Sequence, residues 1–559
     1  MLRLTASLLA IALVSVPLAA QDAAPEESVA ARNERLNAEL PADQAAMKSH
    51  VMFLASDAMR GRDAGSPEYE IAAQYVASQF YEEGLRPAGD DGSYLQKVPL
   101  LNYKPADKGV FTIARKGAAP VALTFGEDYL PSGDPTRAET QVTAPVVFVG
   151  YGLEAPQLGR DDYKGADVKG KIVAVFGGAP SSFPGEERAH FGSPATKAAI
   201  AQKHGAVGVL FLESPITAKS RPLSAMAAFW DRPRMTWMHA DGSGHALAPE
   251  APILGNLSIA GAAKLFEGAR TPWNTIAKAA EKDGATFKPV ALAGTLSVKL
   301  KTSTEKVTSY NVAGLLPGTD PTLKSEVVVL SAHLDHVGVG RPDKTGDTIY
   351  NGAMDNAVGI ASLIEEAKRF KQSGKAPRRS ILFLAVTAEE KGLVGSDYFA
   401  NNPTLPRANL VADVNLDMPI ITYKFEDVIA FGSDRSTIGP IVRKAASDMG
   451  LEFSPDPMPE MGLFVRSDHY RFVQQGIPSV FLWPGEKGPG KEAVEDFFAN
   501  HYHQASDEPW QIRPIDWESG VRFVEINYRI ARGIADMDAR PSWNKGDFFG
   551  TLYNGIGAK

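Results

Sequence analysis

Histidine and carboxylate side chains follow the ends of several separate apolar segments of this 559-residue sequence. Each segment is short, rich in branched residues and typical of a buried strand. Imidazole and carboxylate ligands without sulfur suit zinc, with cobalt or manganese as alternatives. The sequence therefore predicts a metal site with five candidate ligands, which are His333, Asp355, Glu390, Asp417 and His503.

These five side chains are enough to hold two metal ions. Two four-coordinate ions need about eight ligand positions. If Asp355 bridges the ions through both oxygens and a water also bridges them, four positions are filled, and the other four side chains complete the rest. The sequence leaves open which of those four faces which ion. A bridged pair of this kind activates its shared water for hydrolysis.

Glu389 stands directly before a candidate ligand, Glu390. Side chains of adjacent residues diverge, so a metal-bound Glu390 would leave Glu389 facing the water as general base. The alternative is that the two glutamates only cap the helix that follows. Asp335 is expected to accept the second ring N–H of His333. Tyr502 is expected to donate a hydrogen bond to the developing oxyanion, or else only to pack.

The elements that must position these residues alternate between buried strands and helices. This alternation predicts a three-layer α/β/α fold with a mainly parallel sheet. Ligands bind such sheets at the carboxyl ends of the strands, where the candidate residues stand. Strands are predicted at residues 327–330, 381–386, 410–416 and 479–483, and helices at 357–370, 393–401, 438–449 and 517–536.

The sequence divides into a leader, an interrupted catalytic domain and a tail. Residues 1–20 combine a positive start, an apolar run and small residues, which predicts a cleaved secretory signal peptide and a periplasmic or extracellular protein. The alternative, a membrane anchor, is disfavoured because the run is shorter than the roughly 20 residues of a span. Residues 131–295 contain glycine-bounded strands without a histidine–carboxylate cluster, which predicts an inserted β-rich α+β module. The catalytic domain then comprises 21–130 and 296–540, followed by a tail at 541–559.

Composition argues against several classes of protein. The net charge of -8 and the lack of a long basic run argue against a nucleic-acid partner. The absence of cysteine excludes disulfides, thiolate metal sites and a cysteine nucleophile. No later segment is long and apolar enough to span a bilayer, so no stable membrane span is expected after signal cleavage. The expected partner is a peptide substrate, and nothing in the sequence indicates an oligomeric state.

Five motifs resemble the metal-site motifs of the co-catalytic zinc exopeptidases, a family that includes bacterial secreted aminopeptidases and glutamate carboxypeptidase II-type enzymes. The motifs are SAHLDH, GAMDNAVG, TAEEKGLVGS, VNLDM and YHQASD. The resemblance implies two zinc ions on the five candidate ligands, with Asp355 bridging, Glu389 as base and Tyr502 steadying the tetrahedral intermediate. The Asp355–Asn356 peptide matches one that is cis in the family.

Two other features bear on the resemblance. The segments FVGYG and VKGKIV, within the predicted insertion, are similar to the protease-associated domain of many family members. The segment RSDH at residues 466–469 matches the family only loosely. His336 and His469 are therefore not assigned to metal, and both are expected to hydrogen-bond locally.

The predicted function is that of an exported aminopeptidase that releases N-terminal residues. One alternative is a metallo-carboxypeptidase or dipeptidase of the same family, because Arg466 or Arg471 could bind a substrate carboxylate. Another is a glutaminyl cyclase, which resembles the family in fold but uses one zinc. A third is a metal-free receptor or scaffold, although relatives of that kind lack the ligands.

Overall fold

The computed structural model describes residues 28–559, so the predicted signal peptide, residues 1–20, lies outside the described residues. The chain divides into two compact units, one ending at Leu40 and the other running from Pro41 to Lys559. Helix α1 (Val29–Leu36) belongs to the first unit, and the Ser28 side chain caps it by accepting from Ala31 N. None of the helices in residues 28–559 has the length and apolar character that crossing a membrane requires.

Four parallel strands form the centre of the sheet that carries the candidate site. Side chains of β14 alternate between two cores, with Val328 and Leu330 on one face and Val327 and Val329 on the other. Because both faces are covered, these strands are apolar throughout rather than alternating. The predicted mainly parallel α/β/α fold is confirmed. In spatial order the strands are β17 (Ser380–Val386), β14 (Val327–His333), β18 (Leu410–Asn415) and β21 (Ser479–Pro484).

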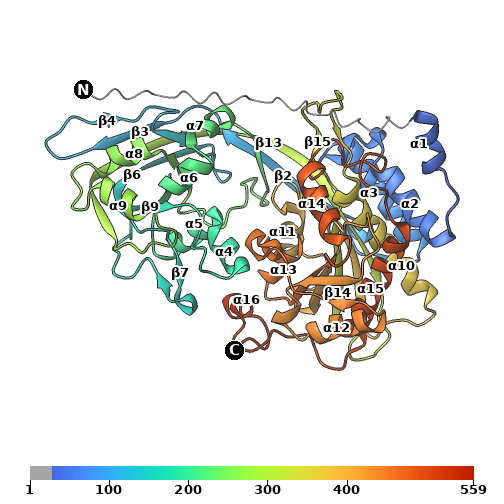
Figure 1. Cartoon of the computed structure of the whole chain (residues 1–559). Helices are drawn as coiled ribbons and strands as arrows, with labels where there is room; N and C mark the ends of the chain where they lie inside the picture. The colour runs from blue at the N-terminus through green and yellow to red at the C-terminus, as the bar shows by residue number, and fades with distance from the viewer. Residues whose placement is uncertain (1–27) are drawn as a thin grey trace, which may run out of the picture. The chain divides into compact units, whose positions relative to one another are not determined.

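Helices cover both faces of these strands (Figure 1). On one face, α10 (Val358–Gln372) packs against α2 (Ala42–Leu54) and α15 (Trp517–Asp536). On the other face, α11 (Val394–Asn401) packs against α13 (His469–Val473). The first face also carries α3 (Pro67–Glu82) and α12 (Gly439–Asp448), and α14 (Gly490–Asn500) precedes the turn with His503.

Antiparallel strands extend the central sheet on both sides. On one side β13 (Val290–Leu316) pairs with β17, and it continues the sheet through β2 (Leu95–Pro105) and β11 (Arg234–Trp237). On the other side β19 (Asp427–Phe431) pairs with β21. The sequence did not predict β11 or β19. Short edge strands are β1 (Arg86–Pro87) and β20 (Glu452–Phe453).

Strand β13 also belongs to a second half of the sheet. Its residues 290–301 pair with β6 (Glu139–Phe148), and residues 295–299 also pair with β3 (Val110–Ala114). The parallel strands β6, β9 (Ile172–Phe176), β10 (Gly208–Leu212) and β12 (Ile253–Leu257) follow, with β4 (Val121–Ala122) and β5 (Tyr129–Pro131) at the edges. Helices α4 (Gly185–Gly192), α5 (Pro194–Lys203), α8 (Ile259–Phe266) and α9 (Trp273–Ala279) accompany them.

Two strand pairings concern the predicted domain limits. The predicted boundary at 295/296 falls inside β13, and β3 and β4 pair in the second half although they precede residue 131. The limits at 131 and 295 therefore stay a proposal.

Side chains of Arg435, α4 and the C-terminal segment connect the two halves of the sheet. The Arg435 guanidinium donates to Glu186 Oε2 (2.6 Å), Glu187 Oε1 (2.9 Å) and Asp547 Oδ2 (2.9 Å). Close by, His190 Nδ1 lies 2.7 Å from the Tyr470 hydroxyl. The predicted tail at 541–559 includes α16 (Phe548–Leu552), whose Phe549 is fully buried.

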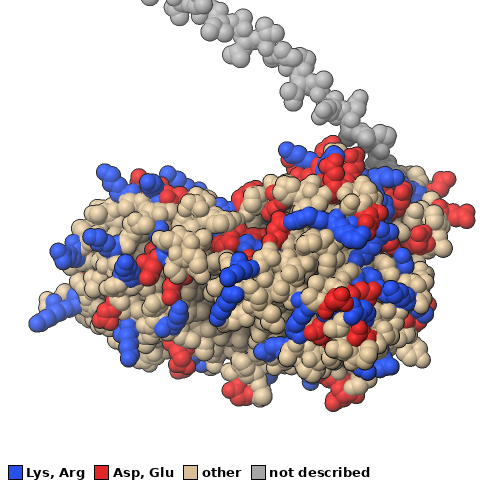
Figure 2. All heavy atoms as spheres, turned by 90° about the horizontal axis from the view of Figure 1, so that it is seen from below, with Lys and Arg blue, Asp and Glu red and all other residues tan. Residues whose placement is uncertain are grey.

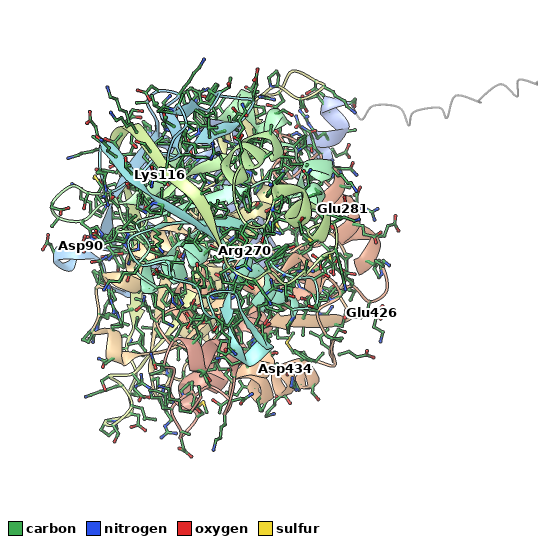
Figure 3. All side chains as sticks on the ribbon, turned by 90° about the vertical axis from the view of Figure 1, so that its left-hand side faces the viewer. Asp90, Lys116, Arg270, Glu281, Glu426 and Asp434 are labelled. Atoms are coloured by element: carbon green, nitrogen blue, oxygen red, sulfur yellow. The ribbon has the colours of Figure 1, made fainter. Side chains whose placement is uncertain are left out.

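Exposed charges of both signs are spread over the surface. Figure 2 shows one face of the molecule on which basic and acidic side chains are interspersed. Such a surface contrasts with the buried carboxylates of the candidate site. Six exposed charged residues are labelled in Figure 3, namely Asp90, Lys116, Arg270, Glu281, Glu426 and Asp434.

Candidate metal centre

The structure brings all five candidate ligands to one place. Three of them follow parallel strands, and the carboxyl ends of such strands meet at one edge of a sheet. His333 ends β14, Glu390 follows β17, and Asp417 follows β18. Asp355 lies in the turn Ala353–Ala357 before α10, and His503 lies in the turn after α14.

Asp355 stands between two imidazole–carboxylate pairs. Its Oδ1 is 3.2 Å from His333 Nε2, which is 2.9 Å from Asp417 Oδ1. Its Oδ2 is 3.2 Å from His503 Nε2, which is 3.0 Å from Glu390 Oε2. A tetrahedral zinc with bonds of about 2.0–2.1 Å separates its ligand atoms by about 3.4 Å. The residues therefore fit two ions that share Asp355.

Burial and mutual charge shift the pKa values of this cluster. Burial lowers the pKa of the His333 imidazole, but Asp417 and Glu389 outweigh it and raise the pKa well above its usual value. Burial also lowers the pKa of His503, but contacts with Asp355 and Glu390 outweigh burial and raise this pKa to about 10. The pKa of Asp355 lies well below its usual range despite burial, because both imidazoles contact it.

Glu389 lines the same cavity as His333 and Asp355. Burial, together with the nearby Glu390, raises the Glu389 pKa well above its usual value, although His333 opposes the shift. A carboxylate with a raised pKa is able to accept and hold a proton at moderate pH. The position of Glu389 is thus compatible with proton transfer.

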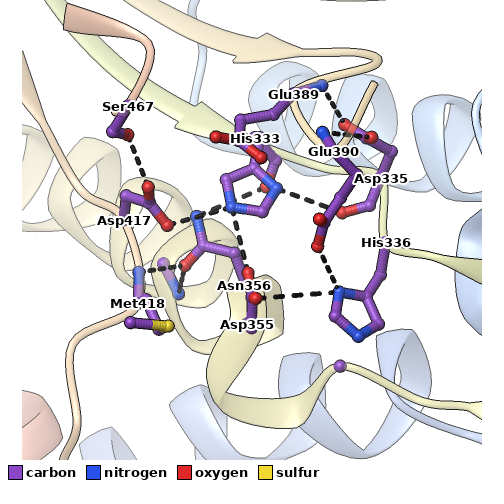
Figure 4. Close-up of polar contacts among 12 residues, drawn as sticks. His333, Asp335, His336, Asp355, Asn356, Glu389, Glu390, Asp417, Met418 and Ser467 are labelled. Atoms are coloured by element: carbon purple, nitrogen blue, oxygen red, sulfur yellow. Dashed lines mark hydrogen bonds and ion pairs between the residues drawn. The ribbon is translucent and has the colours of Figure 1, made fainter. Parts of the chain in front are cut away.

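Asp335 is the partner of the second His333 ring nitrogen, as predicted, but it contacts that nitrogen through its backbone carbonyl instead of its carboxylate. His333 Nδ1 lies 3.1 Å from the backbone carbonyl oxygen of Asp335, not from its carboxylate (Figure 4). That carboxylate accepts instead from the backbone N–H groups of Glu389 (3.0 Å) and Glu390 (3.3 Å). These N–H groups begin a tight turn and need an acceptor in the interior. Asp335 therefore fixes the Glu389–Glu390 turn, while its carbonyl leaves His333 Nε2 free to face Asp355.

Tyr502 and an apolar wall complete the cavity. The Tyr502 ring stacks on His503 with ring centroids 4.0 Å apart, and Arg466 lines the cavity near it. Burial raises the Tyr502 pKa, so the hydroxyl stays protonated and able to donate. The apolar lining consists of Met418, Leu463, Phe481, Trp483 and Phe498.

His336 joins the cluster, contrary to the expectation of a local hydrogen bond. It is fully buried, and its Nδ1 lies 2.7 Å from Glu390 Oε1 and 4.0 Å from Asp355 Oδ2 (Figure 4). His336, Asp355 and Glu390 are close enough together to hold one ion. The spacing of two histidines in SAHLDH was the available signal. His469 lies elsewhere and packs between Phe464 and Phe481.

Further side chains hold the ligands from behind. Ser467 Oγ donates to Asp417 Oδ2 and accepts from Asn415 Nδ2 (2.6 Å). The Asp507 carboxylate accepts from the backbone N–H groups of Met354 (2.9 Å) and Asp355 (3.0 Å). No sequence pattern indicated these roles, apart from the presence of Asp507 in the YHQASD motif. The Asp355–Asn356 peptide is cis, as the resemblance implied.

Comparison with family models bears directly on this region. Residues 311–529 match the model of peptidase family M28, and residues 142–230 match that of the PA domain. The chain therefore carries an M28 peptidase domain. The PA match lies inside the predicted insertion, which makes this an M28 peptidase domain interrupted by a PA domain.

Individual named proteins match parts of the chain. A probable leucine aminopeptidase 2 of Aspergillus oryzae is 28% identical over 45% of this chain and 50% of that protein. Leupeptin-inactivating enzyme 1 of Streptomyces exfoliatus is 31% identical over 32% of this chain and 36% of that protein. The chain thus spans about half or less of the length of these two relatives.

Solved structures with a similar arrangement include two bacterial aminopeptidases. An aminopeptidase from Aneurinibacillus sp. strain AM-1 is 20% identical, with a TM-score of 0.46 over 89% of this chain and 95% of that chain. A zinc aminopeptidase from Bacillus subtilis is 19% identical, with a TM-score of 0.42 over 90% and 97% of the two chains.

Proposed function

We propose that this M28 protein is a zinc-dependent aminopeptidase. The observation that carries the proposal is the position of Asp355, whose two oxygens face separate imidazole–carboxylate pairs. The proposed ligands of two zinc ions, with cobalt or manganese as alternatives, are His333, Asp355, Glu390, Asp417 and His503. When bound, such a pair of ions acidifies a shared water and polarises the scissile carbonyl.

The protein's own side chains supply the proton transfers. Glu389 takes the proton of the attacking water on its carboxylate and passes it to the leaving amine. Tyr502 donates a hydrogen bond to the carbonyl oxygen as negative charge develops there. Asp335 contributes indirectly, because its carboxylate fixes the turn that carries Glu389.

The apolar wall of the cavity supports a preference for a large apolar N-terminal side chain. Met418, Leu463 and Phe498 line the same cavity as candidate ligands. An apolar substrate side chain bound there would be removed from contact with water, which favours its binding. The name of the Aspergillus oryzae relative, probable leucine aminopeptidase 2, points the same way.

A carboxypeptidase or dipeptidase of the same family is the second candidate. Arg466 lines the cavity and could bind a substrate carboxylate. Arg471 supports this alternative less, because its guanidinium already donates to Gln474 Oε1 (3.0 Å) and the Gly392 carbonyl (2.9 Å).

A substrate panel separates these functions. Leucine arylamide, N-acetylated peptides, C-terminally amidated peptides and N-terminal glutaminyl peptides are assayed with and without a chelator. An aminopeptidase cleaves the arylamide and the amidated peptides, rejects N-acetylated ones and loses activity with the chelator. Rejection of amidated peptides would favour the carboxypeptidase, and cyclisation with one zinc per chain would favour the glutaminyl cyclase.

Export is a further part of the proposal, supported by the sequence of residues 1–20. Expression of the full sequence in a bacterium, followed by fractionation and N-terminal sequencing, tests it. A mature protein in the periplasm or medium that begins near Gln21 is expected, and uncleaved protein in the membrane fraction would contradict it.

A further inference from the structure

Arg62 is a fully buried arginine behind the candidate metal centre, with 1% of its surface exposed. It ends the short helical turn Asp57–Arg62 that follows α2. Its guanidinium donates from Nε to the Leu334 carbonyl (3.0 Å), from Nη1 to the Asn351 carbonyl (2.6 Å) and the Leu54 carbonyl, and from Nη2 to the Gly352 carbonyl (3.1 Å).

These carbonyls belong to the two segments that carry the candidate ligands. Leu334 lies between His333 and Asp335, at the end of β14. Asn351 and Gly352 begin the turn that presents Asp355. One planar guanidinium therefore spans segments from separate parts of the chain, and it is bonded to both.

The junction of Asn351 and Gly352 with Arg62 is tightly packed at Gly352. A Cβ at Gly352 would lie 2.2 Å from the Asp355 carbonyl oxygen and 2.6 Å from the His336 ring. Gly352 also has a φ of 62°, which favours glycine. Asn351 ties the same junction to the segment before Arg62, because its Nδ2 donates to the Ala55 carbonyl (2.9 Å) and to Asp57 Oδ1 (2.9 Å).

We propose that Arg62 is a positioning residue that holds the His333 and Asp355 segments at the separation required by the metal pair before metal arrives. The proposal rests on the proposed function only in needing a metal site. Arginine suits this task because its rigid fork offers five N–H donors, whereas lysine offers a flexible point charge. Loss of the fork leaves several buried carbonyls without a donor and lets the segments shift.

The positive charge of Arg62 allows a positioning role to be distinguished from an electrostatic one. The carboxylates nearby, such as Asp507, Asp335 and Asp355, stabilise the buried guanidinium. A cation at this depth also repels incoming metal ions. A purely electrostatic role would therefore weaken metal binding, whereas positioning strengthens it, and the two roles predict opposite effects of removing Arg62.

The test compares zinc affinity among purified variants by competition with a chromophoric chelator. Arg62→Lys keeps the charge and loses the fork, and Arg62→Met loses both. Positioning predicts that both bind zinc at least about 10-fold more weakly than wild type, as removal of groups that orient ligands commonly does. At saturating zinc, the KM of Arg62→Lys is expected to match wild type, because Arg62 does not touch substrate. Unchanged zinc affinity in Arg62→Lys, or tighter binding in Arg62→Met, would overturn the proposal.

Arg379→Lys is the matched control. Arg379 is also fully buried, and it donates to the backbone carbonyls of Ile534 (3.2 Å), Met537 (2.5 Å) and Ala539 (3.1 Å) near the end of α15. Its substitution is expected to lower the melting temperature and leave zinc affinity unchanged. Equal weakening of zinc binding by Arg379→Lys and Arg62→Lys would mean general loosening and would overturn the proposal.

Two further measurements keep the outcome decisive. If the Arg62 variants do not fold, Asn351→Ala replaces them, because it removes two bonds of the same junction and keeps the buried charge. Weaker zinc binding by Asn351→Ala supports positioning, and unchanged binding overturns it. Wild-type protein that binds no zinc overturns both this proposal and the proposed function, whereas two zinc ions on wild type and on Arg62→Lys with equal affinity overturn only this one.

Discussion

Glu389 and Glu390 are neighbours in sequence with different surroundings. The Glu390 carboxylate contacts His503 and His336, and these contacts lower its pKa to about 2 although burial and Asp355 oppose the shift. The Glu389 carboxylate lines the cavity instead, and its pKa is raised. Two adjacent acids with opposite pKa shifts are suited to different tasks, one as a permanent anion and the other as a proton acceptor.

Glu389→Gln is expected to abolish turnover and keep the metal. Loss of a general base lowers kcat by about 10²–10⁴-fold. Zinc content, measured by atomic absorption, should equal that of wild type. Glu390→Gln is the comparison variant and should lose metal. Full activity of Glu389→Gln would show that another group takes the proton.

His503→Ala is expected to lower zinc content from two ions to one per chain. Its Nε2 lies within 3.2 Å of both Asp355 and Glu390, so one proposed ion loses a ligand. His501→Ala serves as control, because His501 Nδ1 contacts Ser506 Oγ (2.9 Å) rather than the carboxylates. Two zinc ions on dialysed His503→Ala would remove this residue from the ligand set.

At the scale of elements, Arg435 follows β19 of the half of the sheet that carries the candidate site. Its side chain contacts both α4 and Asp547, which directly precedes α16. Its guanidinium meets three carboxylates, and its Cζ also lies 4.8 Å from the centre of the Phe549 ring. Only 17% of the side chain is exposed, so the ion pairs are largely shielded from water.

Arg435→Met is expected to destabilise the protein strongly without touching the site. Removing one partner of a largely buried ion pair costs about 3–5 kcal/mol because the remaining charges lose their compensation. Urea unfolding measures the loss, and the KM for leucine arylamide should not change. Arg443→Met tests an exposed pair with Asp434 and should change stability by less than about 1 kcal/mol. Equal effects of the two substitutions would contradict the argument.

The sequence predicts the central strands of the M28 domain, and which side chains meet at their ends, because both signals are local. Apolar runs mark β14, β17, β18 and β21, and three of the motifs stand at the carboxyl ends of β14, β17 and β18. The partner of Asp335, the direction of the His336 ring and the position of Arg62 depend on contacts between distant segments. Arg62 and its partner Leu334, for instance, are 272 residues apart, and no periodicity within either segment signals that pairing.

At the scale of the whole molecule, the two halves of the sheet meet at a neutral buried histidine. His190 is 6% exposed, and burial lowers its pKa to about 4. Its Nδ1 contacts the hydroxyl of Tyr470, which belongs to α13 of the M28 domain.

This histidine should make the protein acid-sensitive. The folded pKa of about 4 lies below the unfolded value of about 6.5, so the unfolded chain binds the proton first as pH falls. Above about pH 6.5, His190 does not reduce the free energy of unfolding. Between about pH 6.5 and pH 4, protonation of His190 in the unfolded chain lowers that free energy by about 3 kcal/mol. His190→Gln should lack this part of the decline when melting temperatures are compared from pH 7.5 to 4.5. Identical pH profiles would contradict the assignment.

The continuity of β13 restricts how this gene can be recombined. Leu296, Val298 and Leu300 point into the core of one half, and Val312 points into the core of the other. Because side chains alternate along a strand, inserting or deleting one residue between 301 and 308 would turn one of those sets outward. A chimaera that receives a foreign PA domain must therefore keep this strand in phase, and grafts offset by an odd number of residues are expected to yield insoluble protein.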